Sequence, residues 1–150
     1  MFGSTFFPGG GGGGGGGGSG IITFTPSFVN LTIGNGVAIG LYTIEGKVLK
    51  GNVSITFGTT TTMAFNPLLV APVAFHPSLI TYTTIGAVGL IDAGISLYMG
   101  EAIINLPNYI SMRVISASGA YAVWTYVSNL VPFTWANGDI MTIEFSYLVS

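Results

Sequence analysis

The stretch Asn52-Val53-Ser54-Ile55-Thr56-Phe57 alternates polar and apolar side chains at every position. Successive side chains of a β-strand point to opposite faces, so a period of two is typical of a strand with one face in a core and the other in solvent. The turn residues Glu45-Gly46 precede this stretch, and a glycine and four threonines follow it. We therefore expect a half-buried antiparallel strand over residues 47–57.

The rest of the chain from Ile21 onward has a similar texture. Short runs rich in Val, Ile, Thr, Tyr and Phe are separated by Gly, Asn and Pro, and no segment combines a helical period with a capping residue. Further strands are expected over residues 21–25, 27–33, 37–44, 68–75, 80–91, 95–104, 109–116, 120–126 and 140–149. We predict an all-β fold, an antiparallel jelly-roll or β-sandwich domain of roughly eight to ten strands over residues 21–150.

An unbroken run of ten glycines, Gly9 to Gly18, precedes this domain. Such a run is either a flexible tether or a left-handed polyglycine helix, whose backbone groups would have to bond to neighbouring chains. A phosphate-binding loop is excluded, because no Lys-Ser/Thr follows the run and no strand precedes it. We expect residues 1–20 to form an extended polyglycine N-terminal arm.

Three aromatic residues, Phe2, Phe6 and Phe7, lie ahead of the glycines with no core of their own. An apolar tip on a stalk is typical of a peg that inserts into a partner, and the alternative is an unstructured terminus. The first interpretation makes Phe2, Phe6 and Phe7 the anchor and the run from Gly9 to Gly18 its stalk.

Charge is scarce: the 150 residues include 3 Lys+Arg and 5 Asp+Glu, about 5% of the chain, and 49% are hydrophobic. Soluble domains usually carry roughly 25% charged residues. A surface this poor in charge leaves uncharged patches that other copies or partners would have to cover. We expect a subunit of an assembly.

The same composition excludes several classes of function. With no cysteine and one histidine, His76, disulfides, thiol nucleophiles and Cys- or His-rich metal sites are excluded. Three basic residues cannot neutralise the phosphates on which nucleic-acid binding depends. Despite a mean hydropathy of +0.72, no run of 18 apolar residues could cross a bilayer as a helix. The N-terminus lacks the basic and apolar regions of an export signal, so we expect no export.

Catalysis lacks a recognisable constellation. A serine-type site would need His76 with Asp92 or Asp139, yet no Gly-x-Ser-x-Gly elbow is present. The carboxylates Asp92, Glu101, Asp139 and Glu144 could form a glycosidase-like pair, but no polar cleft with aromatic sugar platforms is evident around them. We expect no enzymatic activity, no metal and no cofactor.

The most specific motif is Pro132-Phe-Thr-Trp-Ala-Asn-Gly-Asp139, which precedes the last strand and its Ser146-Tyr147. In such a corner, Phe133 and Trp135 would pack beneath the turn. Within Asn137-Gly138-Asp139 the glycine would take a positive φ, and the flanking side chains would bond the turn backbone. This arrangement predicts a structural corner that starts the closing strand.

Two further motifs accompany this corner: Tyr42-x-x-x-Gly46-x-Val48, and Val53-x-Ile55-x-Phe57 followed by Gly58-Thr59-Thr60-Thr61. With them the chain resembles, over about residues 37 to 149, the C-terminal β-domains of tailed-bacteriophage virion proteins. It departs from their pattern in having Phe145 where they have glycine. It also has Phe65-Asn66-Pro67 where they have Trp-x-Phe-x-Leu-Pro.

The resemblance implies a homotrimeric jelly roll of the kind found in tail fibres, head fibres and capsid decorations. A trimer would account for the scarcity of charge and would give the polyglycine run partner chains. The leading hypothesis is a non-enzymatic virion structural protein that is made in the host cytoplasm and lies on the capsid surface or tail. It would be a capsid decoration, cement or head-fibre protein, attached to a capsid or tail protein through its N-terminal arm.

The alternative is a tail-fibre or spike tip that binds a glycan or protein of the host surface. Hydroxyl and tyrosine side chains suit adaptable polar contacts, although they are also ordinary strand residues. The candidate receptor contacts are Thr59, Thr60, Thr61 and Thr62, together with Tyr82, Tyr98, Tyr109 and Tyr121.

Overall fold

The structure, a computed structural model, describes residues 20–116 and 121–150. Within these ranges it contains ten β-strands and no helix, and every strand pair is antiparallel. The expectation of an all-β, antiparallel fold is confirmed. The strands are β1 (Ile22–Phe24), β2 (Phe28–Thr32), β3 (Val37–Glu45), β4 (Val48–Thr56), β5 (Thr62–Val70), β6 (Thr84–Asp92), β7 (Ser96–Asn105), β8 (Tyr109–Ser116), β9 (Val123–Tyr126) and β10 (Ile140–Leu148).

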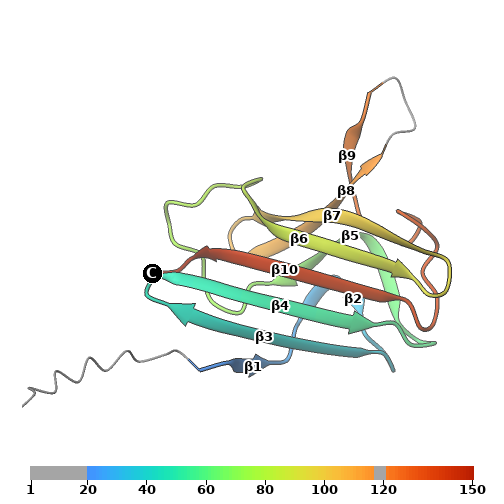
Figure 1. Cartoon of the computed structure of the whole chain (residues 1–150), viewed down its shortest axis with the longest axis horizontal. Coiled ribbons are helices and arrows are strands. Elements are labelled where there is room, and N and C mark those ends of the chain that lie inside the picture. The colour runs from blue at the N-terminus through green and yellow to red at the C-terminus, as the bar shows by residue number, and fades with distance from the viewer. Residues whose placement is uncertain (1–19, 117–120) are drawn as a thin grey trace, which may run out of the picture.

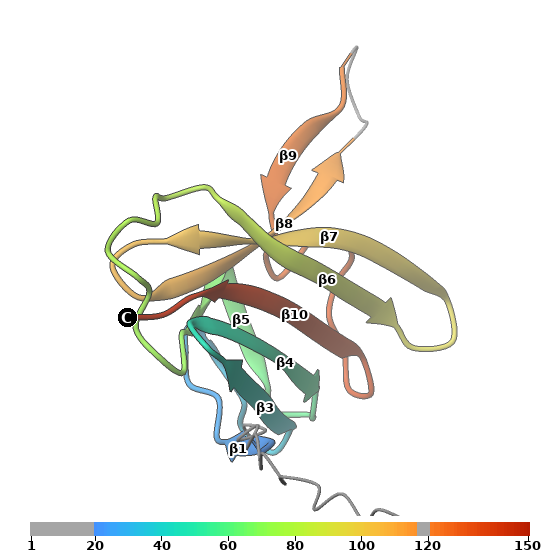
Figure 2. The same cartoon turned by 60° about the vertical axis from the view of Figure 1, so that its left-hand side comes forward.

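All ten strands belong to one sheet, in the order β1-β3-β4-β10-β6-β7-β8-β5-β2, with β9 paired to β8. The sheet curls into a half-barrel, so that β2 and β5 lie behind β3 and β4 (Figure 1) and the layers separate on rotation (Figure 2). This topology does not confirm the expected jelly roll. The expected polyglycine arm lies outside the described residues, apart from Gly20.

The curl is closed by short connections between the two ends of the strand order. Strands β1 and β2 are the opposite edges of the sheet, yet only residues 25–27 join them. Residues 33–36 join β2 to β3, and residues 57–61 join β4 to β5, so each of these segments also crosses from one end of the order to the other. A flat sheet could not accommodate these connections.

The core fills the inside of the curl with alternate residues of each strand. In β10 the side chains of Met141, Ile143, Phe145 and Tyr147 are buried, whereas Glu144, Ser146 and Leu148 between them are exposed. In β4, Val53 and Ile55 are buried and their neighbours are exposed, as the alternation of residues 52–57 predicts.

The large ring of Phe145 is accommodated by a glycine on the neighbouring strand. Phe145 pairs with Gly51 of β4, and a Cβ at residue 51 would lie 2.6 Å from the Phe145 ring. The ring therefore occupies the space that a side chain on β4 would fill. The glycine of this cross-strand pair is on the neighbouring strand.

The expected strand over residues 68–75 is wrong. β5 ends at Val70, and residues 71–83 cross to β6 without regular structure. β5 instead begins at Thr62 and runs through Asn66, which has a positive φ of 52°, and through Pro67. Pro67 is tolerated because pairing of β5 with β8 starts only at Leu68, so its missing N–H costs no ladder bond there. Two other starts also differ: β6 begins at Thr84 rather than residue 80, and β9 at Val123 rather than residue 120.

A close approach of two backbones shapes the outer side of the sheet. The β6–β7 register shifts between Thr84 and Gly86, which brings Gly86 against the backbone of Glu144 in β10. A Cβ on residue 86 would overlap the carbonyl oxygen of Glu144. Only glycine fits here, and its lack of a side chain lets β6 lie close against the backbone of β10.

Replacing Gly86 with alanine tests this close approach. We expect Gly86→Ala to lower the free energy of unfolding by about 2 kcal/mol, because one of the two backbones must move to admit the Cβ. The melting temperature should fall by roughly 5–10 °C. Gly20→Ala is the control, since nothing lies within 4 Å of a Cβ at that position. Equal melting temperatures for the two variants would contradict the register of β6 against β10.

A second prediction concerns Tyr147, which ties the irregular segment 71–83 to β10. Its hydroxyl donates a hydrogen bond to the carbonyl of Val73 (2.9 Å), and its ring packs edge-on against Phe75 (4.8 Å between centroids). Burial raises the pKa of Tyr147 above its ordinary value near 10. Above about pH 10 the unfolded chain therefore loses this proton while the folded protein keeps it, so stability falls as pH rises.

We expect Tyr147→Phe to lose about 1 kcal/mol at pH 7 from the missing hydrogen bond. Its free energy of unfolding should then decline less steeply than that of the wild type between pH 9 and 11. Urea denaturation at several pH values measures both effects, and Tyr121→Phe, which alters an exposed phenol, is the control. Parallel pH profiles for wild type and Tyr147→Phe would exclude this role of the buried phenol.

Candidate functional site

The structure brings the residues of the 132–139 motif together at one corner. The ring of Trp135 stacks on Phe57 of the loop after β4 and lies against Phe133, with 4.5 Å between centroids in both pairs. Its indole N–H donates to the carbonyl of Ser128 (3.0 Å), and Phe133 contacts Tyr98 of β7 (5.5 Å). The corner therefore joins the start of β10 to β7 and to the end of β4.

Asp139 is the buried acid of this corner, with 2% of its surface exposed. One carboxylate oxygen accepts a hydrogen bond from the backbone N–H of Ala93 (3.0 Å) and the other from that of Ala136 (2.6 Å). Gly138 has a positive φ of 94°, and Asn137 is exposed at the turn. Both carboxylate oxygens of Asp139 therefore bind backbone N–H groups, and the side chain joins the corner to the segment that follows β6.

The hydroxyl groups of the threonine run, residues 59–62, bind mainly to the neighbouring β2–β3 turn. The Asn35 side chain donates to the Thr59 hydroxyl (2.8 Å) and accepts from the backbone N–H of Thr60 (2.9 Å). The Thr60 hydroxyl bonds the backbone and side chain of Asn35, and the Thr61 hydroxyl donates to the carbonyl of Ile33 (2.5 Å). Thr62 is the first residue of β5. Thr59, Thr60 and Thr61 thus clamp the β2–β3 turn to the β4–β5 loop.

The four candidate tyrosines come from different elements. Tyr121 and Tyr82 are exposed, Tyr98 lies beside the corner, and Tyr109 is half-buried at the start of β8. Tyr82 lies near Tyr126 of β9; burial, together with Tyr82, raises the pKa of Tyr126. The proposed anchor residues Phe2, Phe6, Phe7, Gly9 and Gly18 lie outside the described residues.

A broad uncharged surface, not identified from the sequence, covers the outer side of five adjacent strands. Its residues form two consecutive rows of cross-strand pairs, and paired residues share a face of the sheet. We call this surface the uncharged face. It consists of Val37 and Ile39 of β3, Ser54 and Thr56 of β4, Ile140 and Thr142 of β10, Gly89 and Ile91 of β6, and Leu97 and Met99 of β7.

Large apolar side chains lie at both margins of the uncharged face. Val37 and Ile39 are 55% and 52% exposed at the β3 margin, and Leu97 and Met99 are 61% and 62% exposed at the β7 margin. Hydroxyl-bearing side chains occupy β4 between the margins. A monomer that exposes so much apolar surface is unusual, and such patches commonly mark interaction sites.

The charges of this side of the sheet lie in the next rows along the strands. Lys50 and Glu45 form an exposed ion pair (2.8 Å), which lowers the pKa of Glu45 through the hydrogen bond and the charge of Lys50. Arg113 of β8 donates to Glu101 of β7 (2.8 Å from Nε) in a largely buried pair. The fifth charge is Glu144.

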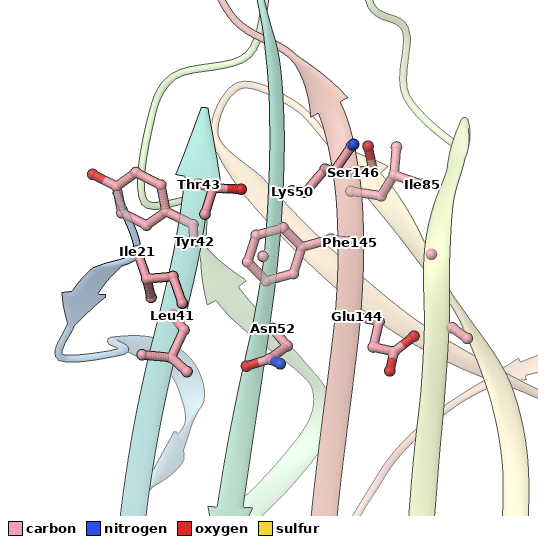
Figure 3. A pocket seen from close by; sticks show the side chains of 13 residues that line it. Ile21, Leu41, Tyr42, Thr43, Lys50, Asn52, Ile85, Glu144, Phe145 and Ser146 are labelled. Carbon is pink, nitrogen blue, oxygen red and sulfur yellow. The ribbon is translucent and has the colours of Figure 1, made fainter. Parts of the chain in front are cut away.

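These charged rows border a hollow of about 690 Å³ on the outer side of β3, β4, β10 and β6. Residues 41–43, 50–52, 144–146 and 85–87 line it, together with Ile21. Figure 3 shows Ile21 and Leu41 on one side and Ile85 on the opposite side, with Asn52 and Glu144 between them. The volume of the hollow is within the size range of small-ligand sites. The hollow is open to solvent, however, and Glu144 is the one carboxylate among its lining residues.

A hairpin formed by the end of β8 and by β9 projects from the body of the sheet (Figures 1 and 2). Ile115 and Trp124 are exposed on it, and the guanidinium of Arg113 lies over the Trp124 ring at 5.2 Å. Thr84 adds a hydrogen bond to Glu101 (2.8 Å). The Arg113–Glu101 pair thereby fixes the root of the hairpin to β7 and β6.

Neither a metal centre nor a membrane-spanning helix is found in the part of the chain that the structure describes. Over residues 20–116 and 121–150, no three His, Asp or Glu side chains gather as metal ligands could. Over the same residues, no helix is long and apolar enough to cross a bilayer.

The corner offers a direct test through Asp139. In Asp139→Asn one of the two carboxylate acceptors becomes an amide NH₂, which cannot accept from a backbone N–H. We expect a loss of about 1–3 kcal/mol in the free energy of unfolding, measured by urea denaturation. Asp92→Asn is the control at a second acidic position in β6. If both variants unfold at the same urea concentration, Asp139 does not hold the corner.

Comparison with known proteins leaves the chain without a match. No protein-family model, no curated protein and no solved structure matches it.

Proposed function

We propose that the chain is a non-enzymatic structural subunit of a bacteriophage virion that assembles as a homotrimer. Its role on the capsid would be that of a decoration, cement or head-fibre protein, attached to a capsid or tail protein through residues 1–20. The observation that carries the proposal is the uncharged face, whose exposed apolar margins need a cover. The motif around residues 132–139 supports the assignment to a virion through its resemblance to phage β-domains.

The position of the two margins favours a cyclic assembly. Val37 and Ile39 lie at one edge of the face, and Leu97 and Met99 lie four strands away at the other. In a ring, each subunit meets its neighbours through two different patches, so the β3 margin of one copy packs against the β7 margin of the next. Three copies related by a threefold axis bury both margins of every copy.

The absence of charge from both margins argues for a second copy as the cover. A partner with a strong charge of its own would gain nothing from this face, whereas apolar burial contributes about 25 cal/mol for each Å² removed from water. Only 5% of the residues are charged, so the surface of a monomer would be poor in charge. In this proposal the assembly covers that surface.

The second candidate, a tail-fibre or spike tip that binds a host receptor, is favoured by the projecting hairpin. Trp124 and Tyr121 are exposed there, and aromatic side chains of this kind are common in recognition surfaces. The hydroxyls of Thr59, Thr60 and Thr61 are already bonded to the β2–β3 turn, so the hairpin is the better receptor site of the two.

The ring arrangement predicts a specific pattern of assembly. By light scattering after size exclusion, the wild type should have three times the 15.5 kDa mass of the chain. Ile39→Lys and Met99→Lys should each be monomers at micromolar concentration, because each places an ammonium group in an apolar contact. Thr134→Lys, at an exposed position of the corner, is the matched control and should remain trimeric.

Mixing the two monomeric variants separates a ring from a twofold dimer. In a ring, Ile39→Lys retains an intact β7 margin and Met99→Lys an intact β3 margin, so the mixture should form a dimer. A twofold interface would use the same patch on both copies, and the mixture would stay monomeric. A wild-type protein that is itself monomeric would refute self-association through this face.

The place in the virion is tested on particles. Cryo-electron microscopy should show tens to hundreds of ordered copies on the shell if the protein decorates the capsid. A few copies confined to the tail would replace that role with the receptor-binding one.

A further inference from the structure

We propose that the hollow on β3, β4, β10 and β6 is a binding site for the phenylalanine-rich segment, residues 2–7, of the same chain. Nothing in the fold fills this hollow from within the described residues. The proposal concerns the free chain and does not depend on self-assembly; attachment to a capsid or tail protein through residues 1–20 would require the segment to leave the hollow.

The hollow has the chemistry of a seat for apolar rings. Its two side walls are aliphatic: Leu41 and Ile21 lie opposite Ile85 (Figure 3), and Ala87 also lines the hollow. The wall on β6 exists because Gly86 lets that strand approach the backbone of Glu144. A volume of about 690 Å³ is large enough for more than one phenyl ring.

The described chain begins at the mouth of this hollow. Ile21 lines it, and the preceding residues lead back through the ten glycines to Phe7, Phe6 and Phe2. The 14 residues from Phe7 to Ile21 span up to about 46 Å when extended, far more than the hollow requires. Glycine adopts both signs of φ, so this stretch can reverse direction and return its aromatic end to the place where the strand begins.

Charge at the rim does not oppose the segment. Residues 1–19 contain no ionisable side chain. At the rim Lys50 is paired with Glu45, and within the described residues no ion pair involves Glu144. The side chains of the segment therefore bring no charge against Lys50 or Glu144 when the rings enter between the aliphatic walls.

The same chain is favoured over a second copy because the tether makes binding intramolecular. Segments held by short linkers experience an effective concentration of order 1 mM, above the micromolar concentration of other copies in dilute solution. The glycine run then keeps three aromatic side chains close to an apolar seat, which limits their exposure to water.

The absence of cysteine makes a crosslinking test clean. The double variant Phe6→Cys/Ser146→Cys places one thiol in the segment and one at an exposed position of the hollow. The control, Phe6→Cys/Thr25→Cys, has its second thiol at an exposed residue that is near Ile21 in sequence but does not line the hollow. Both are built on Ile39→Lys, so that oligomer formation and its possible failure do not enter the result.

We expect the disulfide to form at least fivefold faster in the hollow variant than in the control, within the monomer, under mild oxidation at micromolar protein. Adding Ala87→Lys, which narrows the hollow, should return the rate to that of the control. In the hollow variant only Phe6 is replaced, so Phe2 and Phe7 can still bind in the hollow. Adding Phe2→Ser/Phe7→Ser should therefore also lower the rate of disulfide formation.

Equal rates for the two double variants would overturn the proposal, because a tether without a seat favours neither thiol. A mixture of the single variants Phe6→Cys and Ser146→Cys is the remaining arm. Disulfide-linked dimers forming there as fast as the intramolecular bond would assign the hollow to the segment of a second copy and would overturn the same-chain form.

Discussion

The connection Thr25-Pro26-Ser27 is the constraint on which the rest of the structure depends. It joins the two edges of a sheet that, laid flat, would place β1 and β2 roughly 38 Å apart at 4.8 Å per strand. From Phe24 to Phe28 the chain reaches at most about 14 Å. The sheet has to curl, and Pro26 is buried where its edges approach. The curl encloses the core, which includes Val53, Ile143 and Leu69, so the fold needs no second sheet to cover it.

Two more connections hold the curl closed, and the threonine run at residues 59–62 joins them. The β2–β3 turn and the β4–β5 loop both cross between the ends of the strand order, and Asn35 binds Thr59 and Thr60 where they meet. Hydroxyl groups that look available in the sequence are already engaged. The surface left for recognition is the outer side of the curl, where the uncharged face and the projecting hairpin lie.

Several elements could be predicted from local sequence patterns, whereas the arrangement of these elements in the sheet could not. The alternation around Val53 and Ile55 identified β4, and Asn137-Gly138-Asp139 identified the corner, because both depend on neighbouring residues. β5 was misplaced because Asn66 and Pro67 interrupt its pattern and are tolerated only through a bulge and a late start of pairing with β8. The uncharged face depends on register across five strands, which no single segment specifies.

The same curl explains why apolar residues lie outside as well as inside. A strand of a half-barrel has one face in the core, so Val37, Ile39, Leu97 and Met99 on the other face cannot reach it by any change of rotamer. No described segment of the same chain lies over them, and in the proposed trimer a second copy covers them. The hollow differs, because it is lined by Ile21, which lies next to the first described residue of the same chain. In the two proposals, one outer surface therefore has two occupants: a second copy over the uncharged face, and residues 2–7 in the hollow.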